Sequence, residues 1–174
     1  MKRYTILTTV AICGLFVCGA EAQKNEANRL VESSDRTFVS KAAQGGMAEV
    51  ELGRLATERA SNEKVKHFGQ QMVDDHSKAN EELKNVASNK GTQLPTSMDA
   101  QSQATLKHLS NLHGAAFDRA YIDDMVKDHQ KDVADFQREA EHGTDPDVKA
   151  FAAKTLPTLQ HHLQMAQDAR SAVK

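Results

Sequence analysis

The sequence lacks tryptophan and has little proline and few aromatic residues: three prolines and 5% aromatics among 174 residues. This composition excludes a collagen-like chain, and 39% hydrophobic residues are too many for a disordered acidic tail. The two cysteines, Cys13 and Cys18, both lie near the N-terminus, so a disulfide scaffold is excluded as well. What remains is typical of one helical domain.

A surplus of one charge sign is also absent, and so are the motifs of common enzymes. The formal net charge is −2 at pH 7, whereas a nucleic-acid-binding domain normally carries a clustered basic surplus. No G-x-S-x-G, glycine-rich phosphate loop or H-E-x-x-H occurs. We therefore expect no nucleic-acid partner and no catalytic residues, and the sequence leans against an enzyme without deciding the question.

Residues 1–22 have the features of a secretory signal peptide. Lys2 and Arg3 form a basic start, an apolar stretch runs from about residue 4 to residue 20, and Ala20-Glu21-Ala22 offers a small-x-small cleavage pattern. The apolar stretch is shorter than the ~20 residues that span a bilayer. This favours cleavage before Gln23 over an uncleaved membrane anchor. We expect a periplasmic or otherwise exported protein that keeps neither cysteine and has no membrane span.

Helix-start and helix-stop signals divide the rest of the chain. Residues 23–33 are expected to form a flexible segment, and residues 34–172 one helical domain, with Ser33-Ser34-Asp35 capping its first helix. Four long helices and a short one are predicted, over about 35–60, 63–90, 97–112, 115–142 and 146–172.

Apolar residues at spacings of three and four give each long helix one inward face. Isolated helices are marginal in water, so these faces are expected to meet in a bundle. The connection over residues 91–114 is long enough to return along the bundle, and such a crossover is the ferritin-like topology. The fold class is therefore all-α, a ferritin-like four-helix bundle with a short extra helix in the crossover. The stripes contain Phe38, Ala42, Leu52, Ala56; Val65, Phe68, Met72, Leu83, Val86; Phe117, Tyr121, Met125, Val133, Phe136; and Val148, Phe151, Thr155, Leu159, Ala166.

Part of the first helical hairpin recurs in the second, 83 residues later, which favours a duplicated hairpin. Gly53 and Gly69 lie eight residues on either side of Ser61, so they are expected to face each other where two helices approach closely. The recurring residues are Val50 with Val133, Val65 with Val148, Lys66 with Lys149, and Phe68 with Phe151.

One ionisable side chain falls on each inward stripe, near the middle of its helix. The four residues are Glu49, His76, His129 and His162. Burying such groups is costly unless they are paired or bound to something. One carboxylate with three imidazoles is a suitable ligand set for Zn, Fe, Mn or Cu, so the sequence predicts a candidate transition-metal site.

Three interpretations of these residues stay open. They hold a metal, they form a buried polar network without one, or the helical phase is wrong by one position, and Glu51, His161 and Asp75 then take the inward places. Asp75 and Asp128, each next to a histidine, lie at the edge of the inward face as further ligands or as acceptors that orient an imidazole. Histidines that titrate near neutral pH also suggest a pH sensor.

The other charged residues and histidines are expected on the surface. The charged run from Asp132 to Glu141 is interpreted as a solvated helix face with i,i+4 pairs. The surface histidines are His67, His108, His113 and His142.

Five motifs follow the exported N-terminus: Phe38-x-x-x-Ala42-Ala43, Met47-Ala48-Glu49-Val50-Glu51-Leu52-Gly53, Met72-Val73-Asp74-Asp75-His76, Asp128-His129, and Leu156-Pro157-x-Leu159-x-x-His162. Together they resemble a bacterial ferritin-like domain family of unknown function, whose members are often labelled as outer membrane proteins. The resemblance covers about residues 34–172. It implies a ferritin-related bundle in the cell envelope, without an established activity.

The chain departs from the usual di-iron pattern, which places Glu-x-x-His on two helices. Val73 and Val126 occupy the acidic positions three residues before His76 and His129. This departure favours a mononuclear or an adventitious metal site over a ferroxidase centre.

The resulting hypothesis is an exported protein of uncharacterised activity that binds a transition metal in the bundle core and acts in envelope maintenance or stress. The alternative is a non-enzymatic envelope interaction protein whose buried His/Glu cluster is structural. Envelope proteins are the expected partners under both hypotheses. The sequence leaves open the metal, the substrate or partner, and the oligomeric state.

Overall fold

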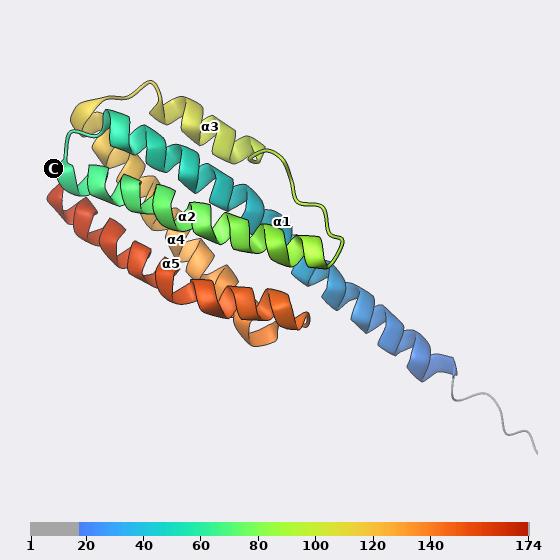
Figure 1. Ribbon diagram of the computed structural model, residues 1–174. Helices are drawn as coiled ribbons and strands as arrows, with labels where there is room; N and C mark the ends of the chain where they lie inside the picture. The colour runs from blue at the N-terminus through green and yellow to red at the C-terminus, as the bar shows by residue number, and fades with distance from the viewer. Residues whose placement is uncertain (1–17, 174) are drawn as a thin grey trace, which may run out of the picture.

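The computed structural model describes the backbone of residues 18–173 and the side chains of residues 34–173. Every regular element in this part of the chain is an α-helix, so the predicted all-α class is confirmed (Figure 1). The helices are α1 Cys18–Arg59, α2 Glu63–Asn89, α3 Ala100–Leu109, α4 Gly114–His142 and α5 Pro146–Ala172.

The structure confirms the capping signals that predicted the start and end of α2 and the start of α5. The side chain of Asn62 caps α2 by accepting a hydrogen bond from the backbone of Lys64, and Asp145 caps α5 in the same way. Gly91 follows α2 with a φ of 61°, the left-handed conformation that glycine adopts without strain. The predicted helix ends therefore hold to within a few residues.

The start of α1 differs from the prediction, because the helix already begins at Cys18. Residues 23–33, expected to be flexible, are helical, and their flexibility remains a prediction. Ser33-Ser34-Asp35 lies inside α1 rather than at its start. Of the expected signal peptide, residues 1–17 lie outside the described part of the chain, so its cleavage also remains a prediction.

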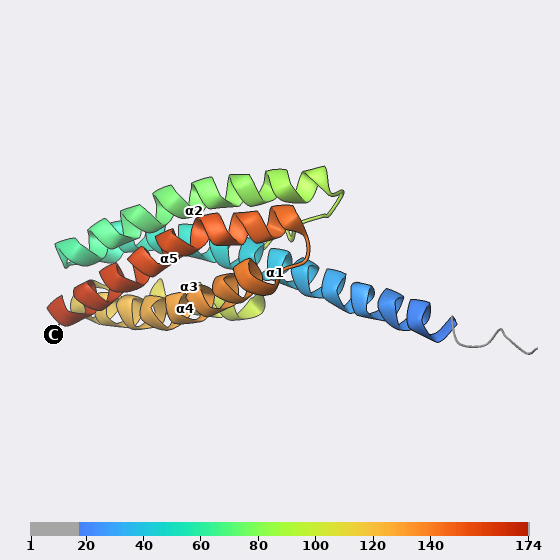
Figure 2. The ribbon, with the colours of Figure 1, turned by 90° about the horizontal axis from the view of Figure 1, so that it is seen from below.

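Two antiparallel helix pairs, α1 with α2 and α4 with α5, lie side by side (Figures 1 and 2). The connection between α2 and α4 contains α3 and returns along α1, so α4 starts at the same end of the molecule as α2. Helices α2 and α5 also pack against each other, as do α1 and α4. None of the helices in the described part of the chain contains an apolar run that could span a bilayer.

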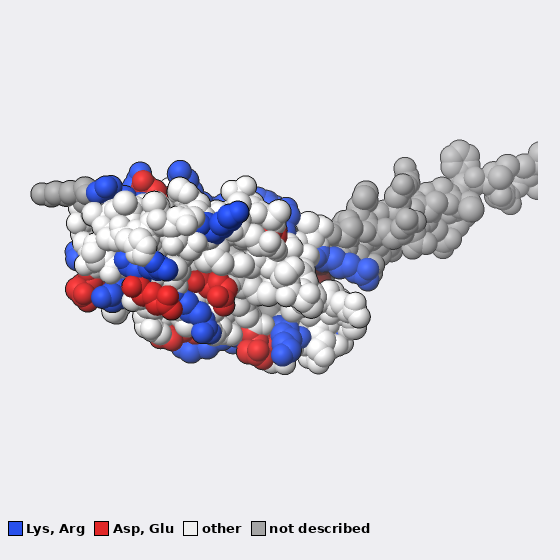
Figure 3. Space-filling view, turned by 90° about the horizontal axis from the view of Figure 1, so that it is seen from above, with Lys and Arg blue, Asp and Glu red and all other residues white. Residues whose placement is uncertain are grey.

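The molecular surface carries both signs of charge. Figure 3 shows one face on which Lys and Arg side chains are interspersed with Asp and Glu side chains. No continuous patch of one sign is visible on that face among the described residues.

Two apolar clusters fill the space between the long helices. One contains Phe68, Phe117 and Tyr121, and the other contains Phe38 and Phe136. On each long helix, the residues of the two clusters occupy different stretches of the sequence. The inward ionisable residues fall between these stretches on α2, α4 and α5, and at the boundary on α1. A polar layer therefore separates two hydrophobic layers.

Each hairpin loop is capped by an aspartate of the other hairpin. Asp118 of α4 accepts hydrogen bonds from the backbone of Ser61 and Asn62, each at 3.0 Å, and from the Ser61 hydroxyl. Asp35 of α1 accepts from the Thr144 hydroxyl and from the backbone N–H of residue 145, both at 2.7 Å. Both aspartates are at most 5% exposed.

These reciprocal caps extend the internal repeat. Asp35 and Asp118 lie 83 residues apart, and the loop residues that they bind are separated by the same distance. Side chains at equivalent positions thus perform the same task in both halves, which supports a duplicated hairpin. The caps also fix the position of each hairpin relative to the other.

Gly53 and Gly69 face each other across the first hairpin, as predicted. A Cβ on Gly53 would lie 2.7 Å from the backbone oxygen of Gly69, far closer than van der Waals contact. A Cβ on Gly45, also in α1, would meet nothing within 4 Å.

This contrast predicts opposite effects of the same substitution at two positions. Gly53→Ala should lower the free energy of unfolding by about 1–3 kcal/mol, because α1 and α2 must move apart. Gly45→Ala should raise it by up to about 1 kcal/mol, because alanine has the higher helix propensity. Urea unfolding of both variants and the wild type tests this, and an equal effect at the two positions would contradict the close approach.

Glu139 lies beside the Asp35 cap and is 5% exposed. Burial, the charge of Asp35, hydrogen bonding to Asp35 and the charge of Asp145 together raise the pKa of Glu139 to about 7. This pKa is higher in the folded than in the unfolded chain. Protonated Glu139 therefore makes its full contribution to the free energy of unfolding below about pH 4.5. This contribution is lost as the pH rises through 7.

The wild type should therefore lose stability between pH 5 and pH 8, and Glu139→Gln should not show this loss. At pH 8 the variant should melt a few degrees above the wild type, while at pH 5 the difference should shrink. Thermal unfolding across this range measures the effect, with Glu141→Gln, an exposed site on the same helix, as the control. If both variants follow the wild-type pH profile, Glu139 does not hold a proton near pH 7 beside Asp35.

Candidate metal centre

The four residues predicted as ligands lie together in the polar layer. Each comes from a different long helix: Glu49 from α1, His76 from α2, His129 from α4 and His162 from α5. All four are buried, His129 and His162 at 0% exposure, Glu49 at 2% and His76 at 5%. The inward positions obtained from the apolar spacing are therefore correct.

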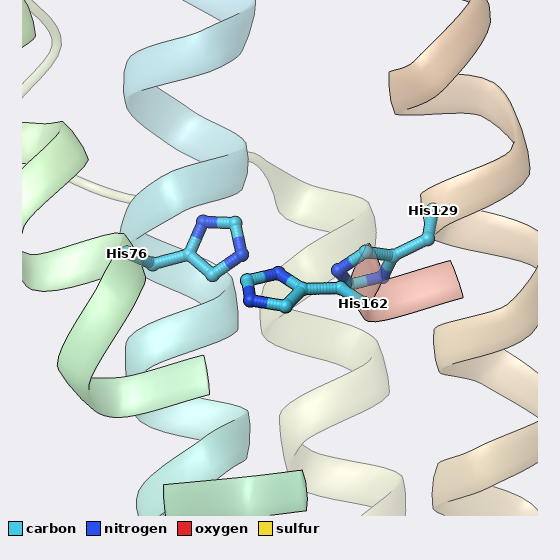
Figure 4. Close-up of side chains that lie close together, drawn as sticks. All are labelled: His76, His129 and His162. Carbon is cyan, nitrogen blue, oxygen red and sulfur yellow. The ribbon is translucent and has the colours of Figure 1, made fainter. Parts of the chain in front are cut away.

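The three imidazoles form a compact triangle. Their ring centroids are 5.3–5.9 Å apart, and each ring offers a nitrogen within 4.8 Å of the nitrogens of the other two. Figure 4 shows the side chains of His76, His129 and His162 pointing toward one another from three helices. A single ion in this space could be reached by all three side chains.

Each histidine uses one ring nitrogen in a hydrogen bond to the protein, and the other nitrogen has no hydrogen-bond partner among the described residues. The free nitrogens are Nε2 of His76, Nε2 of His129 and Nδ1 of His162. The hydrogen bonds run from His76 Nδ1 to Glu49 Oε2 at 2.8 Å, from His129 Nδ1 to the Met125 carbonyl at 3.0 Å, and from His162 Nε2 to Asp75 Oδ2 at 3.0 Å.

This pattern is the one found around metal-binding histidines, where the second ring nitrogen donates to a carboxylate or a carbonyl. Such a bond fixes the ring orientation and leaves a lone pair on the free nitrogen. Three buried nitrogens without a hydrogen-bond partner are costly, and a metal ion would satisfy all three at once.

Burial keeps the imidazoles neutral. Loss of solvation lowers the pKa of His76 and of His162 to about 4 and that of His129 to about 3. Neutral imidazole is the form that binds metals. The folded protein does not protonate these rings near pH 7, so the pH-sensor hypothesis, which needs titration near neutrality, loses its basis.

Glu49 connects the two hairpins inside the layer. One oxygen accepts from His76, and the other, Oε1, lies 3.5 Å from Nε2 of His129 without a hydrogen bond. Burial and the charge of Asp128 raise the pKa of Glu49 well above its usual value. Glu49 thus contacts one imidazole directly and faces a second one.

Asp75 is a hydrogen-bond acceptor at the edge of the layer, one of the two roles considered for it. Burial alone raises the pKa of its carboxyl, but hydrogen bonds from Gln71 and His162 outweigh that effect and lower it. Asp75 therefore remains ionised and holds the His162 ring with Nε2 protonated.

The residues that a phase error would have brought inward are not in the layer. Glu51 and His161 are exposed, and Asp75 lies only at its edge. The histidines expected on the surface, His67, His108, His113 and His142, are all exposed as well.

Asp132 was missed, because it stands at the start of a charged run that we interpreted as a solvated face. It is only 17% exposed and forms a second group of carboxylates with Glu49 and Asp128. Two signals in the sequence point to it: it follows His129 by three residues, and it lies 83 residues after Glu49, the repeat distance. The Met125 carbonyl, which accepts from His129, is a backbone group, so no pattern of side chains could have identified it.

A family described as a domain of unknown function, DUF4142, matches residues 20–169. The chain therefore belongs to this family. No curated protein matches it significantly.

Two solved structures are similar in fold. A DUF305 fragment from Deinococcus radiodurans has a TM-score of 0.70 at 16% identity, covering 80% of this chain and 96% of its own. A candidate secreted DUF305 protein from Streptomyces coelicolor has a TM-score of 0.65 at 16% identity, covering 78% of this chain and 89% of its own. At this identity the likeness concerns the fold alone.

The lowered pKa values of the histidines predict acid destabilisation well above the pH at which most carboxylates titrate. An unfolded chain binds protons to histidine below about pH 6.5, whereas these folded rings stay neutral down to about pH 4. The free energy of unfolding should therefore fall as the pH drops from 6.5 to 4. His129→Gln should make this decline shallower.

Urea unfolding at pH 7, 5.5 and 4 measures the slope. The control is His161→Gln, an exposed neighbour of His162 whose replacement should leave the slope unchanged. A wild-type slope in His129→Gln would mean that His129 is protonated in the folded protein.

Proposed function

We propose that this member of the DUF4142 family is an exported protein with a ferritin-like helical bundle, which binds one transition-metal ion through His76, His129 and His162. The observation that supports the proposal is the set of three buried ring nitrogens that make no hydrogen bond, each on an imidazole whose other nitrogen is already hydrogen-bonded. Glu49 and Asp75 act as the acceptors that orient two of the rings, and Glu49 remains the candidate fourth ligand.

The donor set indicates which metals fit. Three neutral imidazoles suit Zn²⁺, Cu²⁺ and Fe²⁺, and intrinsic affinity rises toward Cu²⁺ in the divalent series. Mn²⁺ prefers oxygen ligands, so it is the weakest of the four metals considered for this site. Val73 and Val126 stand where a di-iron bundle carries glutamates, which supports a mononuclear site rather than a ferroxidase centre.

The location in the cell envelope and the ferritin-like topology rest on separate support. The N-terminal 22 residues have the pattern of a signal peptide, and a neighbour in fold is described as a candidate secreted protein. The crossover between two antiparallel helix pairs supports the ferritin-like arrangement. A role in handling or storing metal for envelope maintenance or stress follows from the combination of export and metal binding.

The alternative is an envelope interaction protein in which the cluster only holds the helices in register. The direct hydrogen bond between Glu49 and His76, at 2.8 Å, favours it, because that contact joins α1 to α2 without any metal. Both proposals expect destabilisation when a histidine is replaced. They differ in metal content.

Metal binding is tested on the untagged protein as purified from the cell, by elemental analysis and by calorimetric titration with Zn²⁺ and Cu²⁺. We expect one ion per chain, with affinity reduced at least about 10–100-fold in His129→Ala and in His162→Ala, a loss that even outer hydrogen-bond partners can cause. His161→Ala, next to the site but exposed, is the matched control and should bind normally.

Two results would overturn the proposal. One is wild-type protein that stays empty after incubation with either metal, which favours the structural alternative. The other is binding that His161→Ala weakens as much as His129→Ala does, because the ion would then sit on the surface.

A further inference from the structure

A second group of ligand-type side chains lies beside the imidazole triangle. Glu49, Asp128 and Asp132 each offer a carboxylate oxygen, and these oxygens lie within 4.8 Å of one another. Asp128 and Asp132 are one turn apart on α4, so both point from the same helix face toward Glu49 on α1. This group contains no histidine, and Glu49 is the one residue that it shares with the site proposed above.

The charges in this group are poorly compensated by the protein. Lys131 is the neighbouring cation, but its Nζ lies 3.0 Å from Asp135 and 3.7 Å from Asp132, and its side chain is 61% exposed. Three carboxylates thus lie together with one exposed lysine as their neighbouring cation.

Glu49 supplies an independent reason to expect a ligand. Its side chain is 2% exposed, and only Oε2 has a hydrogen bond, the one from His76. Oε1 has no hydrogen-bond partner among the described residues. A fully buried carboxylate oxygen without a donor is rare, because its lost hydration is not replaced, and a bound cation replaces it.

The group is accessible from outside, unlike His129 and His162. A groove with a volume of about 880 Å³ is lined by Glu49, His76, Asp128 and Asp132, with Asp99 and Asp135 on its walls. Lys41, Lys131 and Arg138 also line the groove, but carboxylates outnumber them, and an acidic excess attracts cations. A cation entering this groove meets the carboxylates before it reaches His129 or His162, neither of which lines it.

We propose that Glu49, Asp128 and Asp132 form a second cation site, which takes an oxygen-preferring divalent ion such as Mn²⁺, Ca²⁺ or Mg²⁺. Carboxylates are the preferred ligands of these ions, whereas the neighbouring imidazoles suit Zn²⁺ and Cu²⁺. Glu49 belongs to both groups: Oε2 accepts from His76, and Oε1 has no hydrogen bond and lies 3.5 Å from His129 Nε2. The polar layer thus presents nitrogen ligands in the core and oxygen ligands at the groove.

The test uses Mn²⁺ as the probe, followed by electron paramagnetic resonance and calorimetry on the protein as purified, before and after saturation with Zn²⁺. We expect one Mn²⁺ per chain that Zn²⁺ does not displace and that Ca²⁺ or Mg²⁺ competes for. Asp128→Asn with Asp132→Asn should weaken Mn²⁺ binding at least about 10–100-fold. Asp74→Asn with Glu141→Gln, two exposed carboxylates, is the matched control and should bind Mn²⁺ normally.

The same variants separate this site from the imidazole site. His129→Ala with His162→Ala should keep Mn²⁺ binding even if Zn²⁺ is lost, and Asp128→Asn with Asp132→Asn should keep Zn²⁺ binding. The asparagine pair removes like-charge repulsion, so it should fold and melt at or above the wild-type temperature without metal. Circular dichroism verifies this.

A measurement without variants gives a second answer. Paramagnetic broadening by Mn²⁺ should first affect backbone amides around residues 128–132 in the nuclear magnetic resonance spectrum. Wild-type protein that does not bind Mn²⁺ would refute the acidic site whatever the Zn²⁺ result. Mn²⁺ binding that is lost in His129→Ala with His162→Ala but kept in Asp128→Asn with Asp132→Asn would refute it too.

Discussion

The reciprocal caps of Asp35 and Asp118 are the interactions on which the arrangement of the bundle depends. Each is a buried carboxylate of one hairpin that accepts hydrogen bonds from the loop of the other hairpin. Sliding one helix by a single residue would move these groups by about 1.5 Å and break the bonds. Glu49 and His76 belong to the first hairpin, and His129 and His162 belong to the second, so this register is what brings them to one level.

The polar layer is a constraint of another kind. It separates two hydrophobic clusters and contains buried groups whose hydrogen-bonding capacity the protein satisfies only in part. Each imidazole is fixed by one bond and left open at the other nitrogen. Glu49 is likewise half satisfied. Incomplete satisfaction of this kind is unfavourable for stability alone.

Most of the fold could be predicted because it follows from local rules. The cap of α2 at Asn62, the cap of α5 at Asp145 and the glycine after α2 follow from backbone chemistry. The start of α1 could not be predicted in the same way. Asp35 resembles a helix cap in the sequence, but its carboxylate binds a loop 109 residues further along the chain, a partner that no local pattern identifies.

The sequence by itself determined the helices, their inward faces and the four ionisable residues on them, because spacings of three and four residues place side chains on one helix face. It also contained the repeat that joins Asp35 to Asp118 and Glu49 to Asp132. Only the tertiary structure decided which ring nitrogens are free, that Asp132 is buried beside Glu49, and that a groove reaches the carboxylates. These features depend on distances between helices, and helical periodicity specifies a direction around one helix but no distance to the next.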